Sequence, residues 1–160
     1  MSREILLTAD GGDAIWFVGT LMIIKATKEE TGDWSLIDWL MPAGSSPPTH
    51  IHRDEDEAFY VMEGRAPFYL DDEPFEGGPG SFVFLPRGVK HTFQVDPSGP
   101  ARFMIVTSPE GNFEKFIREM GTPAQSLTLP PLEEPLDEVR LAATMAKYDM
   151  DVVGPPAGEL

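Results

Sequence analysis

The chain has 160 residues, a length that fits one domain and is too short for two ordinary ones. Hydrophobic residues make up 41% and charged residues 24%, a globular composition that excludes a disordered chain. The net charge of −15 repels phosphate backbones and anionic headgroups, and the absence of cysteine excludes disulfides, thiolate zinc sites and thiol nucleophiles.

The N-terminal segment has no basic region followed by a long apolar run, so no signal peptide is visible. The apolar stretch Leu21–Ile24 is far shorter than the roughly 20 residues that a membrane-spanning helix needs. We therefore expect a cytoplasmic protein that binds neither membranes nor nucleic acid.

Short runs of β-branched and aromatic residues alternate with glycine and proline through most of the chain. This pattern is typical of an all-β sandwich or barrel, and about eight strands, the number in a jelly roll, are predicted. The predicted strands are 14–27 with a break near Gly19, 34–41, 49–52, 57–63, 65–70, 81–85, 90–95 and 102–107.

The pattern becomes helical after Thr107. Ser108 is the predicted N-cap of a first helix, Gly121 is its stop, and its apolar face is Phe113, Phe116, Ile117 and Met120. A second helix is predicted over 136–148, with a face of Leu136, Val139, Ala143 and Ala146. The connector 122–135 is rich in proline, and the tail 154–158 is expected to be loose.

The histidines are the most informative residues, and there are three of them. His50 and His52 are two residues apart, so in a strand both imidazoles face the same side. Glu57 opens the next predicted strand, where it can face the same interior, while the intervening 53–56 is predicted to be a solvated turn. His91 follows a Pro-Arg-Gly turn and can add a ligand from a strand distant in sequence.

These residues also match two known motifs. The first consists of Gly44, His50, His52, Glu57 and Gly64. The second consists of Gly80, Pro86, Gly88 and His91, and it departs from the usual pattern at its end, where Val95 replaces a frequent asparagine. With both motifs at their usual spacing, the sequence resembles the cupin superfamily.

The resemblance implies a single cupin domain over 1–160. We expect a cupin jelly-roll barrel, or double-stranded β-helix, over about 14–107, with a helical C-terminal extension of two helices over about 109–150. Small cupins commonly dimerise, and the apolar strand Ile15–Ile24 is the edge that we expect a homodimer to cover.

Carried over residue by residue, the resemblance implies that His50, His52, Glu57 and His91 bind one metal ion. Three imidazoles and a carboxylate suit a divalent first-row transition metal: Fe, Mn, Co, Ni, Cu or Zn. Four protein ligands leave an octahedral ion an open position, which is typical of a catalytic site. Glu57 is the expected catalytic base as well as a ligand.

Four apolar residues share strand parity with the expected ligands and face the interior: Phe59, Val61, Phe93 and Val95. The sequence leaves open whether they line a substrate pocket or fill the core.

The segments 110–121 and 141–156 resemble the tail of single-domain bacterial cupins described as quercetin 2,3-dioxygenase-like. This resemblance favours a metal-dependent dioxygenase acting on a small enolic or phenolic, flavonol-like substrate. Two alternatives remain open: an oxygen-independent metal-dependent lyase, isomerase or cyclase, and a non-catalytic module that binds a small ligand.

Overall fold

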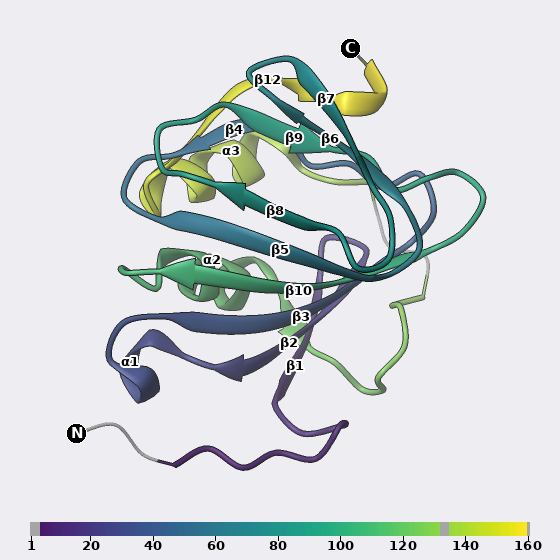
Figure 1. The fold of residues 1–160 in the computed structure, drawn as a ribbon. Coiled ribbons are helices and arrows are strands. Elements are labelled where there is room, and N and C mark those ends of the chain that lie inside the picture. The colour runs from purple at the N-terminus through teal and green to yellow at the C-terminus, as the bar shows by residue number, and fades with distance from the viewer. Residues whose placement is uncertain (1–3, 132–134, 160) are drawn as a thin grey trace.

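Two β-sheets packed face to face form the body of the protein in a computed structural model, which describes residues 4–131 and 135–159 (Figure 1). One sheet has seven strands in the order β11-β1-β2-β3-β10-β5-β8, and the other has five in the order β12-β4-β9-β6-β7. All the pairings are antiparallel. The predicted all-β, double-stranded β-helix is therefore confirmed, and so are the two C-terminal helices.

The elements have the following bounds. The strands are β1 (Asp13–Phe17), β2 (Thr20–Ala26), β3 (Ser35–Met41), β4 (Pro48–His52), β5 (Asp56–Glu63), β6 (Ala66–Leu70), β7 (Glu73–Gly77), β8 (Phe82–Leu85), β9 (His91–Phe93), β10 (Ala101–Ser108), β11 (Thr122–Pro123) and β12 (Met150–Pro156). The helices are α1 (Lys28–Thr31), α2 (Asn112–Met120), α3 (Glu138–Lys147) and the 3-10 turn η1 (Ala157–Glu159).

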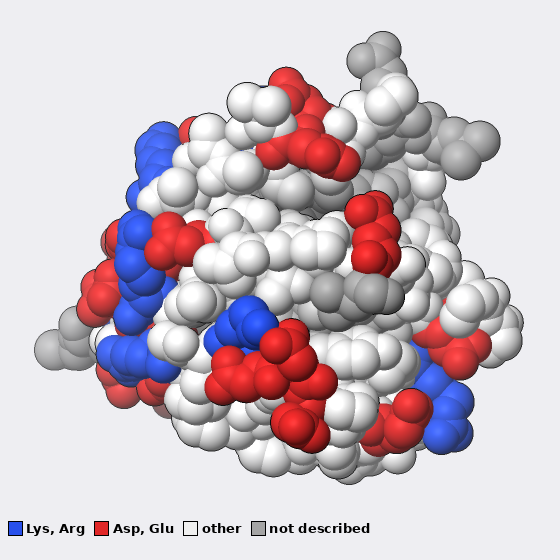
Figure 2. All heavy atoms as spheres, turned by 90° about the horizontal axis from the view of Figure 1, so that it is seen from above, with Lys and Arg blue, Asp and Glu red and all other residues white. Residues whose placement is uncertain are grey.

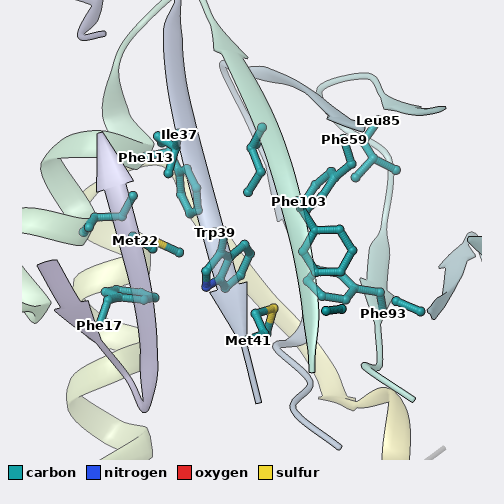
Figure 3. Close-up of a cluster of buried hydrophobic side chains, with 14 of the residues drawn as sticks. Phe17, Met22, Ile37, Trp39, Met41, Phe59, Leu85, Phe93, Phe103 and Phe113 are labelled. Carbon is teal, nitrogen blue, oxygen red and sulfur yellow. The ribbon is translucent and has the colours of Figure 1, made fainter. Parts of the chain in front are cut away.

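The core between the sheets is built largely from aromatic rings (Figure 3). Phe59, Phe68, Phe93 and Phe103 contact one another, with ring centroids 5.0–6.2 Å apart. Trp39 extends this cluster, and its ring centroid lies 5.7 Å from that of Phe93. Each of these residues comes from the inward-facing positions of a strand, as the alternation of buried and exposed residues predicts.

Helix α2 closes one side of this core with the apolar face that the sequence predicts. Phe113 packs against Trp39 at 6.3 Å and Phe116 against Phe17 at 5.2 Å between ring centroids. The predicted N-cap at Ser108 is wrong: Ser108 is the last residue of β10, and the helix cap is Gly111, with φ 72°. The strand runs further than expected because Ser108 still pairs with Asp56 of β5.

Helix α3 is present, but its buried face differs from the predicted one. Leu141, Thr144 and Met145 are its buried residues, whereas Val139 is 81% exposed. The helix turns its larger apolar side chains toward the core and leaves its small alanines at 143 and 146 on the outside. This choice is physically reasonable because a buried leucine or methionine removes more apolar area from water than an alanine does.

The C-terminal tail is not loose, contrary to the expectation from its glycine and prolines. It forms β12, which pairs with β4 along the strand that carries two of the histidines: Met150 is opposite His52, and Val152 is opposite His50. Arg53 strengthens this junction with ion pairs of 2.8 Å to Asp149 and 2.6 Å to Asp151. The tail therefore completes the five-stranded sheet.

The segment Ile15–Ile24 forms a hairpin, and it does not offer the free edge that we expected a second subunit to cover. Its strands β1 and β2 lie between β11 and β3 of the same chain. In the part of the chain that the structure describes, no helix is long and apolar enough to cross a membrane.

Charge is distributed unevenly over the face above the five-stranded sheet (Figure 2). Acidic groups are scattered across this view, while basic groups gather mainly at its left edge beside acidic ones. Ion pairs in the described part of the chain include Arg53–Asp149 and Arg87–Asp56, with N–O distances of 2.8 Å each. A phosphate backbone would find few unpaired cations on such a surface.

The pairing of β12 with β4 predicts slow amide exchange in the tail. We expect the amides of residues 150–152 to exchange at rates close to those of β4 and far more slowly than those of residues 5–11, which form no strand. Hydrogen exchange followed by mass spectrometry measures both segments in one experiment. Exchange of 150–152 within seconds would contradict the observed sheet order.

Candidate metal centre

Strand β4 places His50 and His52 on the same side, facing the interior. Its outward neighbour Ile51 is partly exposed, whereas the two histidines are 8% and 3% exposed. This is the alternation that the spacing of two residues predicts for a strand.

The other two side chains come from strands of both sheets. His91 on β9 is the register partner of His50, and Glu57 on β5 reaches the same place from the seven-stranded sheet. Gly88 forms the turn that leads into β9; it has φ 83°, and its N–H donates to the carbonyl of His52 at 2.8 Å. A residue with a side chain would be strained at that φ, so glycine is needed there.

The structure brings these four side chains together. His50, His52, Glu57 and His91 each offer one ligand atom, and these atoms all lie within 4.8 Å of one another. Glu57 Oε2 lies 3.5 Å from His52 Nε2 and 3.4 Å from His91 Nε2. Hydrogen bonds between nitrogen and oxygen are usually shorter, at about 2.7–3.2 Å. Two ligands of one ion, each about 2.1 Å from it, lie about 3.0–3.4 Å apart, close to these distances.

Backbone carbonyls fix the orientation of two of the imidazoles. His50 Nδ1 donates to the carbonyl of Pro48 at 2.7 Å, and His91 Nδ1 donates to the carbonyl of Val89 at 3.0 Å. In a neutral ring this leaves the lone pair on Nε2. Metal-ligating histidines have this arrangement, because the second nitrogen is held by a hydrogen bond outside the site.

Burial and mutual contact shift the pKa values of the clustered side chains. It lowers the pKa of His50 well below its ordinary value, with help from the neighbouring His91 and His52, and it also lowers the pKa of His52. For Glu57, burial raises the pKa, but the adjacent His52 and His91 lower it by more, so the carboxyl pKa falls below its usual range. Neutral imidazoles beside an ionised carboxylate are the forms that bind a cation.

Several buried polar atoms in this cluster lack hydrogen-bond partners among the described residues. They are both ring nitrogens of His52 and Nε2 of His91. Unpaired buried polar atoms are rare in folded proteins and call for a partner such as an ion. The donor set, three nitrogens and a carboxylate, fits a first-row transition metal better than Mg²⁺ or Ca²⁺. The cluster can therefore hold such an ion.

The expectation that 53–56 forms a solvated turn is wrong for Glu55, which is 2% exposed. Its carboxylate accepts hydrogen bonds from the backbone N–H groups of Asn112 at 2.9 Å and Phe113 at 3.0 Å, at the first turn of α2. A carboxylate at a helix N-terminus is stabilised by the helix dipole. Glu55 thereby anchors Phe113, whose ring lies 6.0 Å from that of His52.

A cavity of about 110 Å³ lies beside the cluster, and His50, Glu57 and His91 line it. Its wall is largely apolar and includes six aromatic rings: Phe17, Trp39, Phe59, Phe93, Phe113 and Phe116. The C-terminal extension adds Leu136, Leu141, Met145 and Met150. Leu136 is 44% exposed, so it marks where the cavity meets the surface.

The four apolar residues expected to face the interior fall into two groups. Phe59 and Phe93 line the cavity, whereas Val61 and Val95 are fully buried in the core and are absent from its wall. Sequence parity could not separate the groups, because it fixes the side of a strand and not the depth along the barrel. The wall contributed by α2 and α3 was not predicted from the sequence.

The family follows from comparison with known proteins. Residues 38–107 match the family model of the cupin domain, Cupin_2, and this stretch contains all four clustered side chains. This stretch of the chain is a cupin domain. The matched stretch ends before α2, so the helices and β12 lie outside it.

Three known proteins are similar to this cupin. Quercetin 2,3-dioxygenase of Bacillus subtilis is 27% identical over 133 residues, which is 83% of this chain and 39% of that protein. KdgF from Halomonas sp. has a similar structure, with a TM-score of 0.59, 19% identity, and coverage of 68% of this chain and 96% of that one. The polyketide cyclase RemF from Streptomyces resistomycificus gives a TM-score of 0.53, 24% identity, and coverage of 68% and 80%.

The chain matches only part of the length of its curated relatives. The chain spans 39% and 64% of the lengths of two curated relatives that it matches. At their identities, the two structures share the fold with this cupin and say nothing further about its reaction.

The cluster predicts how metal binding responds to mutation and pH. We expect His50→Ala, His52→Ala and His91→Ala each to lose most bound metal, because each removes a nitrogen donor. In the wild type, protons compete with the metal for imidazole, so bound metal falls as pH drops. Since burial lowers the pKa of His50 and His52, the loss occurs below their ordinary value of 6.5, at about pH 6 and lower.

Metal content by mass spectrometry after equilibrium dialysis checks both expectations. Gln94→Ala, on a partly buried side chain outside the cluster, is the matched control and keeps its metal. Metal content that stays flat from pH 7.5 to about 4.5 would argue against histidine ligation.

Proposed function

We propose that this cupin is a metal-dependent dioxygenase of a small enolic or phenolic compound. One observation carries the proposal: an aromatic-walled cavity opens onto a buried cluster of three histidines and one glutamate. The metal site at His50, His52, Glu57 and His91 is part of the proposal.

The character of the cavity wall supports a planar apolar substrate. Among its described lining residues there is no lysine or arginine, and Glu57 is the one acidic residue. Recognition of carboxylate, phosphate or uronate groups normally uses cationic side chains, above all arginine. The aromatic rings instead offer stacking and edge contacts to a planar molecule. The hydroxyl of an enol or phenol needs a polar contact. His50, Glu57 and His91 in the cavity wall can provide it.

The similarity to a quercetin 2,3-dioxygenase also supports a dioxygenase reaction. The similarity to quercetin 2,3-dioxygenase extends over 133 residues and so includes parts of the chain beyond the cupin motifs. That protein's name gives the reaction class, and we propose the same class for this chain.

The roles of the residues follow from their positions. A redox-active first-row transition metal held by His50, His52, Glu57 and His91 would supply Lewis acidity toward the substrate hydroxyl and redox chemistry toward dioxygen. Glu57 lines the cavity, and its carboxylate accepts the hydroxyl proton. His50 and His91 are fixed in orientation because their Nδ1–H groups donate to backbone carbonyls. The aromatic walls exclude water from the ionised substrate.

The cavity is small, and it is open to the surface on one side. An apolar cavity of about 150 Å³ in another protein holds benzene, and the cavity here is about 110 Å³. A flavonol has three rings, so it would have to extend past Leu136 into solvent. We therefore propose that a one-ring phenol or a short enol fits this cavity best, and the flavonol-like substrate expected from the sequence stays a prediction.

The experiment is oxygen uptake by the protein loaded separately with Fe, Mn, Co, Ni, Cu or Zn, over a panel of one-ring phenols and short enols. Oxygen consumption matched to product supports the proposal. Product formed equally without oxygen would replace it with a lyase, isomerase or cyclase. Binding of the panel without turnover under any metal would replace it with a ligand-binding module.

The base role of Glu57 gives a quantitative prediction. In Glu57→Gln the amide keeps the size of the side chain but accepts no proton, and general-base catalysis typically contributes about 10²–10⁴-fold. At full metal occupancy we expect turnover of a protonated substrate to fall at least about a hundredfold. The loss should shrink for substrates whose hydroxyl is already ionised at the assay pH. Near-normal turnover of the protonated substrate would leave Glu57 as a ligand alone.

The C-terminal extension gives a prediction on substrate size. Met145 on α3 is 3% exposed and lines the cavity, so Met145→Ala enlarges it. We expect kcat/KM to rise for two-ring and three-ring phenols relative to one-ring phenols, and the protein to lose about 2–5 kcal/mol of stability. Val139→Ala, on the exposed side of the same helix, leaves the ratio unchanged. Competition between substrates, followed by chromatography, measures the ratio. An unchanged ratio in Met145→Ala would mean that α3 does not limit substrate size.

A further inference from the structure

A buried hydroxyl group without a partner lies close to the metal cluster. Among the described residues, four buried side-chain atoms make no hydrogen bond. Three of them belong to His52 and His91, and the fourth is Oγ1 of Thr107, a residue of β10 that is 0% exposed. An unpaired buried hydroxyl costs free energy, so its presence in a folded protein calls for a physical reason.

The register of the seven-stranded sheet places Thr107 directly opposite Glu57. The two residues are partners across the pairing of β10 with β5. Buried residues recur at every second position of β10, Thr107 among them, and Glu57 is 3% exposed, so both side chains face the core. Directly opposite residues of an antiparallel pair have Cβ atoms about 4.5–5.5 Å apart. A turn about the side-chain torsions is therefore enough to bring the Thr107 hydroxyl to the Glu57 carboxylate.

Packing alone gives no reason for a hydroxyl at this position. The preceding inward residues of β10 are Phe103 and Ile105, which are apolar and 0% exposed. Valine has nearly the shape of threonine, favours strands and buries no polar atom. Departures of this kind from the apolar pattern of a core are expected at functional sites.

The neighbour on the other side of Thr107 is a weaker partner than Glu57. Ser35 of β3 is the register partner there, and its hydroxyl already donates to Oε2 of Glu114 at 2.8 Å. Ser35 could therefore only accept a neutral hydrogen bond from Thr107. A hydrogen bond to an ionised carboxylate is roughly twice as strong as a neutral one, which favours Glu57 as the acceptor.

We propose that Thr107 is a positioning residue for Glu57: its hydroxyl donates to the Glu57 carboxylate and holds it toward the ion that the cluster binds. This inference rests on the proposed metal site and does not depend on the reaction carried out there. Oε2 of Glu57 lies 3.5 Å from Nε2 of His52 and 3.4 Å from Nε2 of His91, so Oε1 is the oxygen left to accept the bond. Thr107 is not among the residues that line the cavity, so the bond leaves the substrate side of Glu57 free.

The test is the affinity for Zn²⁺ and Co²⁺, measured by competition with a chelator of known affinity. Thr107→Val removes the hydroxyl and keeps the shape of the side chain. We expect it to weaken metal binding about tenfold to a hundredfold, as is typical when a hydrogen-bond partner of a metal ligand is lost. Thr107→Ser keeps the hydroxyl and retains most of the affinity. Thr144→Val, whose hydroxyl donates to the carbonyl of Arg140 at 2.8 Å on α3, is the matched control and leaves the affinity unchanged.

Two further measurements separate positioning from a purely structural role. If Thr107 acts through Glu57, Thr107→Val has little further effect on affinity in a Glu57→Ala background, where no carboxylate remains to be held. The melting temperature of the metal-free protein is not lowered by Thr107→Val, because the lost hydroxyl has no partner among the described residues.

The outcomes distinguish failure of this inference from failure of the proposed function. Wild-type affinity in Thr107→Val would overturn the inference and leave the metal site standing. An equal loss of affinity in the Glu57→Ala background, or a lower melting temperature of metal-free Thr107→Val, would assign Thr107 to the fold and also overturn it. A wild type that binds neither ion would overturn the metal site together with this inference. These affinities do not depend on oxygen uptake, so failure of the proposed reaction would leave them unchanged.

Discussion

Three imidazoles and a carboxylate are buried against one another, and this is the constraint on which the rest of the structure depends. Burying a charge without a partner is costly, and Glu57 and the three histidines are at most 8% exposed. The protein limits the cost by keeping His50 and His52 neutral, as their lowered pKa values show, and by leaving one carboxylate ionised. What remains is a small anionic cluster that can hold a divalent cation.

The surrounding fold holds these groups at fixed positions from several directions. Two of the rings are held by carbonyls of their own strands, and the turn before His91 is joined to His52 by the N–H of Gly88. Strand β12 supports β4 from its other side. Glu55 holds the first turn of α2, which places Phe113 beside His52. Segments that follow the cupin motifs in sequence therefore shape the environment of residues inside them.

The sequence predicted those features that depend on local spacing. Because His50 and His52 are two residues apart, their side chains were predicted to point to the same side of one strand. The positions of glycine and proline predicted that the strands would be short. The features that it did not predict depend on contacts between distant segments. Glu55 is buried because the N-terminus of α2, 57 residues further along, meets it. Strand β12 forms because an edge of β4 is available for pairing, although its own Gly-Pro-Pro sequence favours irregular structure.

The period of two residues in a strand gives β5 two different faces. Glu57 and Phe59 face inward to the cluster and the cavity, while Ala58 and Tyr60 face outward on the seven-stranded sheet. A single strand thus carries both surfaces, and a shift of its register by one residue would exchange them. The pairing of β5 with β10 and with β8 prevents such a shift. The same two pairings therefore hold Glu57 at its place in the cluster.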